Sequence, residues 1–420
     1  MQYDPQTLAQ IRRGRSRFVA MVITYGLGVF NDSFFRQAAI LLAVAEGHKH
    51  MQGWIMSLFA LPYLLFASPV GWLADRFSKK HVVIGAKALE VVAMGFGAAG
   101  LLTLNWYLVL VMVFIMAMQS CLFSPALNGS IPELYPDVYV TRANATLKVV
   151  VTIMILAGVA AAGAALGFKA SGWRGLPIGR VIVSIGVVAI AAGGLAMSFG
   201  VVRRPAADPR ARFPRQGPLS TARELIAIRA DSLLFKVVLA TVFIWFAGSM
   251  LIQFITVMAV EQFEWGEAVG GYLVAAELVG LAAGGLLASR LGEGRWYRVI
   301  GPCMMAMAVV LLVAEMLPFM PASARLASAY GLLGAVGVLG GVVMIPCEAF
   351  IQRRPPAGRK GTVIASSNFG VFFGILVSGP LANAANAVLD EPTRGMALMG
   401  AVTLVVGALL RRAFAKEKGS

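Results

Sequence analysis

The chain has 420 residues, of which 59% are hydrophobic and only 13% are charged, and its mean hydropathy is +0.78. Soluble globular domains carry about 25% charged residues, so this composition excludes an ordinary water-soluble protein. A net charge of +16 would favour a nucleic-acid partner if the chain were soluble. Because the apolar residues come in long blocks, membrane topology is the better explanation of the charge.

A helix needs about 20 residues to cross ~30 Å of hydrocarbon, and many blocks of this chain are that long. In chain order, we expect transmembrane helices at 18–45, 51–74, 81–102, 106–126, 141–168, 177–202, 234–260, 268–289, 297–316, 325–350, 361–386 and 393–414. The sequence therefore predicts an all-α membrane protein with twelve transmembrane helices. We expect a six-helix half over 1–202, a cytoplasmic linker over 203–231 and a second six-helix half over 232–420.

The linker is the only long hydrophilic stretch. Pro205 and Pro209 exclude a continuous helix over its first part. Its later part, 220–229, mixes Leu225 and Ile226 with charged residues, which predicts an amphipathic helix at the membrane interface.

The basic residues are distributed unevenly between the two sides of the membrane. If the N-terminus is cytoplasmic and the helices alternate in direction, 27 of the 36 Lys and Arg residues fall in cytoplasmic segments and six in segments on the other side. This asymmetry follows the positive-inside rule and predicts that both termini are cytoplasmic. No nucleic-acid partner is expected.

The sequence contains no pattern for catalysis or for metal binding. Cys121, Cys303 and Cys347 stand alone in apolar helical sequence, without a CxxC pair or a histidine cluster. No nucleophile–base constellation and no phosphate-binding Gly-x4-Gly-Lys-Ser/Thr loop occurs. We therefore expect no enzyme activity, no cofactor, no metal site and no ATP-driven pumping.

The second predicted helix ends in the segment Gly71-Trp-Leu-Ala-Asp75-Arg76, and Lys80 closes the loop after it. This segment resembles the signature between helices 2 and 3 of the major facilitator superfamily. The resemblance implies a cytoplasmic gating loop that contains Gly71, Asp75, Arg76 and Lys80.

The two halves repeat each other. Pro125 and Gly158 recur as Pro346 and Gly379, each 221 residues later. Such internal repeats are typical of secondary transporters, whose substrate site lies between the halves near the bilayer midplane.

Within the superfamily, the segments 124–134, 142–144 and 345–356 resemble the bacterial lysophospholipid transporters. The resemblance implies a lysophospholipid or a similar amphiphile as substrate, in contact with membrane lipids, at the bacterial inner membrane. Some members of that family carry a fused acyltransferase domain, so a separate acyltransferase is a candidate partner.

Ionisable residues inside a bilayer are costly and mark functional positions. Asn31 and Asp32 lie deep in the first predicted helix, and Arg36 follows Asp32 by one turn. Asp32 and Arg36 either neutralise each other or face a cavity that holds a zwitterion or exchanges a proton. Lys87 and Glu90, three residues apart in the third helix, are expected to form an intramembrane ion pair.

Other candidates for substrate binding or proton coupling come from four further helices. Glu277 is the deepest acid of the second half, with no basic residue in its own helix. Lys148 either extends to the interface or contacts phosphate. Gln253 and Asn368 either join helices or contact the substrate.

Two small-residue runs, 157–163 and 280–285, indicate either tight helix packing or a seam that admits a lipid tail.

These residues support two functions. A single-tailed phospholipid needs a cation for its phosphate, an acid for an amine and an apolar groove for its acyl chain. We therefore expect a transporter that moves lysophospholipid by alternating access. The alternative is a proton-coupled exporter of hydrophobic drugs or other small molecules, in which Asp32 or Glu277 titrates.

Overall fold

The computed structural model describes residues 5–128, 135–172, 175–200, 210, 213, 217–288, 296–355 and 360–417. The helices are α1 (Pro5–Ala45), α2 (His50–Leu65), α3 (Ala67–Arg76), α4 (Lys79–Thr103), α5 (Trp106–Asn128), α7 (Asp137–Leu166), α8 (Ile178–Ser198), α9 (Gly217–Ala227), α10 (Ser232–Val257), α11 (Gly266–Ala288), α12 (Ile300–Ala314), α13 (Ala322–Arg353), α14 (Lys360–Val388) and α15 (Pro392–Ala415). Short 3₁₀ turns and one π-helical turn, Met258–Gln262, join or extend them. Within the described ranges, eleven helices are long and apolar enough to cross a membrane.

The structure divides the helix expected over 51–74 into α2 and α3. The break falls at Phe66, whose φ of −110° and ψ of 3° are not helical. Pro69 lies three residues further on and has no N–H to donate to the carbonyl of Leu65. In the first turn of α3 that missing donor costs nothing, so the chain starts a new helix there.

Local signals set other helix ends. α4 ends at Thr103, and the next residue, Leu104, has a left-handed φ of 55°. The side-chain oxygen of Asn105 then accepts hydrogen bonds from the N–H groups of Tyr107 (3.1 Å) and Leu108 (3.3 Å), which caps α5. α1 begins at Pro5, earlier than the expected residue 18, because proline suits the first helical position and good helix formers follow it.

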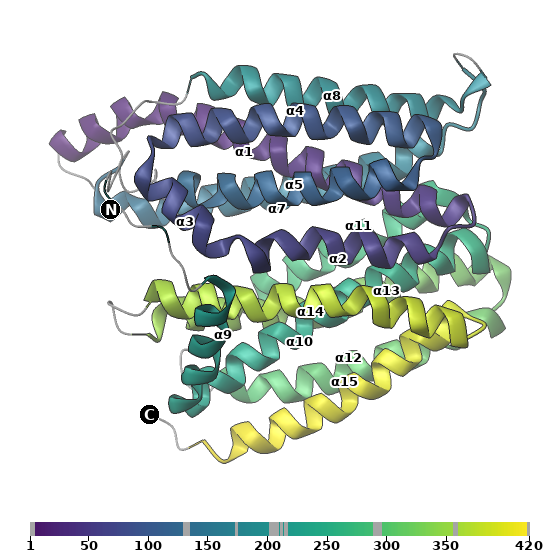
Figure 1. The fold of residues 1–420 in the computed structure, drawn as a ribbon. Coiled ribbons are helices and arrows are strands. Elements are labelled where there is room, and N and C mark those ends of the chain that lie inside the picture. The colour runs from purple at the N-terminus through teal and green to yellow at the C-terminus, as the bar shows by residue number, and fades with distance from the viewer. Residues whose placement is uncertain are drawn as a thin grey trace. The chain divides into compact units, whose positions relative to one another are not determined.

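Packing divides the chain into two compact units, Met1–Ala39 with Leu61–Pro218, and Ile40–Ala60 with Leu219–Ser420. In the first unit, α4 packs against α5 and α8. A buried cluster that includes Phe18, Val83 and Phe123 joins α1, α4, α5 and α7. Figure 1 shows α4, α5, α7 and α8 running along one another.

In the second unit, α11 packs along α13. A Cβ on Gly284 would lie 2.0 Å from the carbonyl oxygen of Val338, and one on Gly337 would lie 2.0 Å from that of Glu277. Only glycine allows two backbones to approach so closely. The small residues of 280–285 therefore serve tight packing inside this unit.

The second unit also contains the start of α2. The hydroxyl of Ser57 donates to the carbonyl of Leu376 at 2.8 Å, and the amide of Asn383 donates to the carbonyl of His50 at 2.8 Å. A Cβ on Gly379 would meet the carbonyl oxygen of Gly53 at 2.2 Å. Hydrogen bonds and a close glycine contact thus hold α2 against α14.

Candidate functional site

The first unit contains a cluster of charged side chains deep in an apolar helix bundle. Asp32 of α1 accepts hydrogen bonds from the hydroxyl of Ser120 and, at 3.4 Å, from the amide of Gln119, both on α5. Arg36 lies one helical turn further along α1 and interacts electrostatically with Asp32 and with Tyr63 of α2. An acid and a guanidinium therefore lie beside each other, together with neutral hydrogen-bonding groups.

A second part of the cluster is the ion pair between Lys87 and Glu90 on α4. Their charged atoms are 2.6 Å apart, and the side chains are only 2% and 1% exposed. The ammonium group lies 5.1 Å from the ring centre of Phe123, a favourable cation–π distance. The other Glu90 oxygen accepts from the amide of Asn31 at 3.3 Å, and that amide also donates to the carbonyl of Val187 at 3.0 Å.

Glycines make room for this buried lysine. A Cβ on Gly28 of α1 would lie 2.5 Å from the Lys87 nitrogen, and one on Gly194 of α8 would lie 3.5 Å from it. The ammonium group therefore lies directly against the surfaces of two helices, at a depth where an unpaired charge would be very costly.

The two parts act on each other electrostatically. Asp32 follows Asn31 directly, and its carboxylate interacts electrostatically with both Glu90 and Lys87. The four charged groups, two acids and two bases, sum to zero. Such a neutral cluster is suited to a ligand that carries both signs of charge.

Sequence reasoning did not single out Tyr63, Gln119 or Ser120. The sequence does carry a signal for two of them. Gln119 and Ser120 are the only Gln and the only Ser in the apolar run 106–123. Tyr63 carried no such signal, since a tyrosine in an apolar helix is usually a packing residue.

The second unit places its candidate residues differently. Gln253 of α10 is fully buried and its amide donates to the carbonyl of Ser249 at 3.2 Å. The hydroxyl of Ser249 in turn lies 2.7 Å from the hydroxyl of Ser378 on α14 and shares a hydrogen bond with it. Glu277 of α11 is 5% exposed, and its Oε2 has no hydrogen-bond partner among the described residues. Asn368 is exposed on α14.

The gating-loop candidates are only partly described. The guanidinium of Arg76 lies 5.4 Å from the Trp72 ring centre, and Lys80 donates to the carbonyl of Phe199 at 2.9 Å. Gly71 and Asp75 belong to α3 and Lys148 to α7, but their side chains lie outside the described part of the structure.

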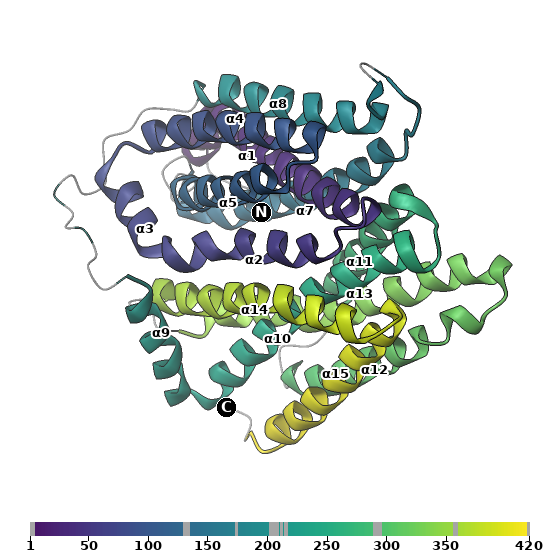
Figure 2. The ribbon, with the colours of Figure 1, turned by 45° about the vertical axis from the view of Figure 1, so that its right-hand side comes forward.

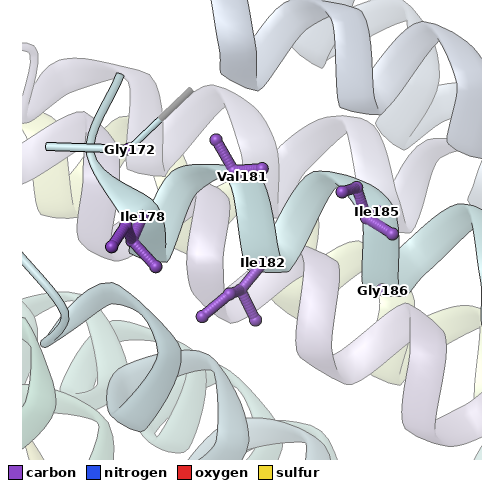
Figure 3. Close-up of a pocket in the computed structure, with 6 residues that line it drawn as sticks. All are labelled: Gly172, Ile178, Val181, Ile182, Ile185 and Gly186. Atoms are coloured by element: carbon purple, nitrogen blue, oxygen red, sulfur yellow. The ribbon is translucent and has the colours of Figure 1, made fainter. Parts of the chain in front are cut away.

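An open, shallow apolar depression lies along the first turns of α8 (Figure 3). Ile178, Val181, Ile182 and Ile185 line it with carbon atoms, together with Gly172 and Gly186. Such a lining fits an alkyl chain and offers nothing to a headgroup. In the described ranges, no three His, Cys, Asp or Glu side chains come together as a metal site would need.

Most of the chain matches proteins of known families. Residues 20–379 match the sequence model of the Major Facilitator Superfamily. A lysophospholipid transporter, LplT, of Shigella flexneri is 26% identical over 364 residues, and LplT of an Escherichia coli strain is 27% identical over 365 residues; each alignment covers 84% of this chain and 84% of the relative.

Solved structures share the fold. A bacterial homologue of the human lysosomal transporter Spinster, solved in an inward-facing and unoccupied conformation, has a TM-score of 0.72 and 16% identity, with 97% of this chain and 98% of the other covered. The xylose transporter XylE of E. coli, in an inward-open conformation, has a TM-score of 0.67 and 14% identity, with 96% of both chains covered.

Proposed function

This chain is a multi-pass membrane protein that belongs to the major facilitator superfamily, and from that premise we propose that it moves lysophospholipid, or a similar amphiphile, across the bacterial inner membrane by alternating access. The observation that carries the proposal is the neutral cluster of Asp32, Arg36, Lys87 and Glu90 inside the first unit. The lysophospholipid transporters that align with 84% of the chain support the choice of substrate.

The division of roles follows from how accessible each charged side chain is. Lys87 and Glu90 are hydrogen-bonded to each other and shielded by helices, so we assign them to holding Asn31 and balancing Asp32. Asp32 and Arg36 are partly exposed. We assign them to the substrate, the acid at an ammonium group and the guanidinium at a phosphate. Ser120 and Gln119 orient the carboxylate of Asp32.

In the second unit, Gln253, Glu277 and Asn368 are proposed as further polar contacts during transport, and Lys148 of the first unit as a further cation for phosphate. Buried polar atoms without partners, such as Glu277 Oε2 and Gln253 Oε1, favour a role that brings them a partner in another state.

We further propose that both termini face the cytoplasm and that the two repeats divide at the 203–231 linker. In this topology Gly71, Asp75, Arg76 and Lys80 form a cytoplasmic gate. The distribution of Lys and Arg supports the orientation. A separate acyltransferase that consumes the transported lysophospholipid is a candidate partner.

The test is transport in proteoliposomes. Purified protein is reconstituted and a lysophospholipid with a labelled headgroup is added to one leaflet, and its appearance in the other leaflet is followed. Asp32→Asn should lower the rate by at least about tenfold, since removing a charge-assisted contact costs roughly 1.5–3 kcal/mol. Asp390→Asn, which alters a carboxylate that is 93% exposed, should leave the rate unchanged. Wild-type rates for Asp32→Asn in well-folded protein would contradict the assignment of Asp32.

One observation favours a second candidate, a proton-coupled exporter of hydrophobic drugs. Glu277 is a buried acid without a charged partner among the described residues, the kind of group that carries a proton. Proteoliposomes with an imposed pH gradient distinguish the two functions. Uptake of hydrophobic cations that needs the gradient and is lost in Glu277→Gln, without lysophospholipid movement, would favour the exporter.

A further inference from the structure

The short helix α9 does not run parallel to the membrane-spanning helices. α9 is followed by a 3₁₀ turn, Ile228–Ala230, and then by α10. In Figures 1 and 2, α9 runs transverse to α14 at one end of the second unit. At 1.5 Å per residue its eleven residues cover only about 16 Å, too short to span a bilayer. Because α10 begins a membrane span at Ser232, α9 lies at the level of the membrane surface.

The inner face of this segment is anchored by packing. Leu225 contacts α14, since a Cβ on Gly370 would lie 3.5 Å from its methyl carbon, and Ile228 is only 5% exposed. Asp231, directly after the turn, accepts a hydrogen bond from the N–H of Leu234 at 3.1 Å. Its carboxylate also pairs with Arg354, the residue that follows α13, at 2.9 Å. The segment is therefore held in a defined orientation on the second unit.

The outer face carries aliphatic and basic side chains together. Leu219 is 61% exposed and Ile226 is 58% exposed. Arg223 is exposed between them on the same face, because residues four and seven positions apart share one side of a helix. Arg229, in the turn, is also exposed, and its guanidinium lies 5.4 Å from the Phe235 ring centre. Water alone would be a poor environment for the two aliphatic side chains.

Among the described residues, the exposed charges of α9 and its following turn are positive. The carboxylates of Asp231 and Glu417 are each bonded to a cation, Arg354 and Lys236 respectively. Glu224, the acid of α9, is half-buried, whereas Arg223 and Arg229 extend from the surface. A surface that combines exposed leucine and isoleucine with arginine matches the boundary between acyl chains and anionic headgroups.

We propose that α9 is a binding site for anionic phospholipid headgroups of the leaflet in which it lies. Leu219 and Ile226 enter the acyl-chain boundary, and Arg223 and Arg229 hold lipid phosphates. This inference requires only that the chain spans a membrane, and it is independent of the transported substrate.

Lipid-specific fluorescence quenching tests the proposal on the full-length protein. A bimane label is placed at Leu219→Cys, with Cys121, Cys303 and Cys347 replaced by serine or alanine. All vesicles contain phosphatidylcholine and phosphatidylglycerol in one fixed ratio, so the membrane charge never changes. In one set a fraction of the phosphatidylglycerol is brominated, and in the other an equal amount of the phosphatidylcholine is brominated.

Brominated phosphatidylglycerol should quench more strongly, with a local enrichment of about fivefold for each arginine. The double variant Arg223→Gln with Arg229→Gln should make both lipids quench equally. Arg411→Gln with Arg412→Gln removes the same charge from α15 and should preserve the preference. A label at Val388→Cys, at the other end of α14, should show no preference.

Equal quenching by both lipids in protein with its arginines intact would overturn the selectivity for anionic lipid. Absence of quenching by either lipid would overturn the membrane contact itself. If Leu219→Cys does not fold, Ile226→Cys occupies the same face and gives the same readout.

Discussion

The two units treat the charged groups inside their helix bundles in opposite ways. In the first unit, Asp32, Lys87 and Glu90 all have hydrogen-bond partners, drawn from α1, α4 and α5. In the second, the acid Glu277 is buried, and its Oε2 has no hydrogen-bond partner among the described residues. A satisfied network is rigid and specifies one arrangement, whereas an unsatisfied group favours any state that supplies a partner.

The two units are held together by different kinds of interaction. The first unit holds two acids and two bases whose charges sum to zero. The second relies on backbone contact between α11 and α13 and leaves its acid without compensation. Stability measurements can separate these two designs.

The largest effect is expected from breaking the ion pair of the first unit. Lys87→Met leaves Glu90 buried without its cation, which should lower the free energy of unfolding by about 3–5 kcal/mol. Pairing it with Glu90→Leu should restore most of the loss, because no buried charge is then left alone. Thermal unfolding of the purified protein in detergent measures both. A single variant as stable as the wild type would show that Lys87 does not hold Glu90.

The next effect tests the backbone contact of the second unit. Gly337→Ala places a Cβ 2.0 Å from the carbonyl oxygen of Glu277, so α11 and α13 must separate. Overpacking of this kind costs about 1–3 kcal/mol. Gly331→Ala on the same helix has open space and should be neutral or slightly stabilising. Equal stability of the two variants would contradict the role of the contact.

Substitution of Glu277 itself should change the free energy of unfolding by less, and in the opposite direction. Glu277→Leu removes a buried oxygen without a partner and should raise the free energy of unfolding by about 1 kcal/mol. The matched control is Glu267→Leu on the same helix. Glu267 is equally buried but lies in the first turn, where the helix N-terminus stabilises an acid, so its loss should destabilise. A destabilised Glu277→Leu would mean that the carboxylate has a stabilising partner.

The smallest effect is at the partnered acid Glu417, at the end of the second unit. Hydrogen bonds from Lys236 and Ser232 lower the pKa of Glu417 below its ordinary 4.5. Its stabilisation is therefore present above pH 4.5 and is lost as the pH falls through the lowered folded-state pKa. Glu417→Gln should cost about 0.2–1 kcal/mol at pH 7, and the difference from wild type should disappear in acid. Unfolding curves at a series of pH values measure it. A constant difference at every pH would contradict the ionic origin.

The helices were predictable because hydropathy and length act locally. The expected segments coincide with the long helices, and the amphipathic stretch at 220–229 is helical as α9 and its following turn. The break between α2 and α3 was missed, although Pro69 is visible in the sequence. Proline within a hydrophobic run is compatible with a kinked helix as well as with a new one, and packing decides between them.

The candidate site was only partly predictable. The spacing of Lys87 and Glu90 indicated a pair within one helix, which requires no knowledge of the fold. That Asn31 reaches Glu90, and that Ser120 and Gln119 reach Asp32, depends on how α1 meets α4 and α5. No local rule gives such distances between residues that are 59 to 88 positions apart.

By itself, the sequence determined that this chain lies in a membrane, where its helices run and which ionisable residues enter the bilayer. These follow from the cost of placing polar groups in hydrocarbon, which each segment meets on its own. Only the tertiary structure decided which buried groups are paired and which are not, as the contrast between Asp32 and Glu277 shows. Partners come from other helices, and their distance is set by side-chain packing and by glycines such as Gly28 and Gly337.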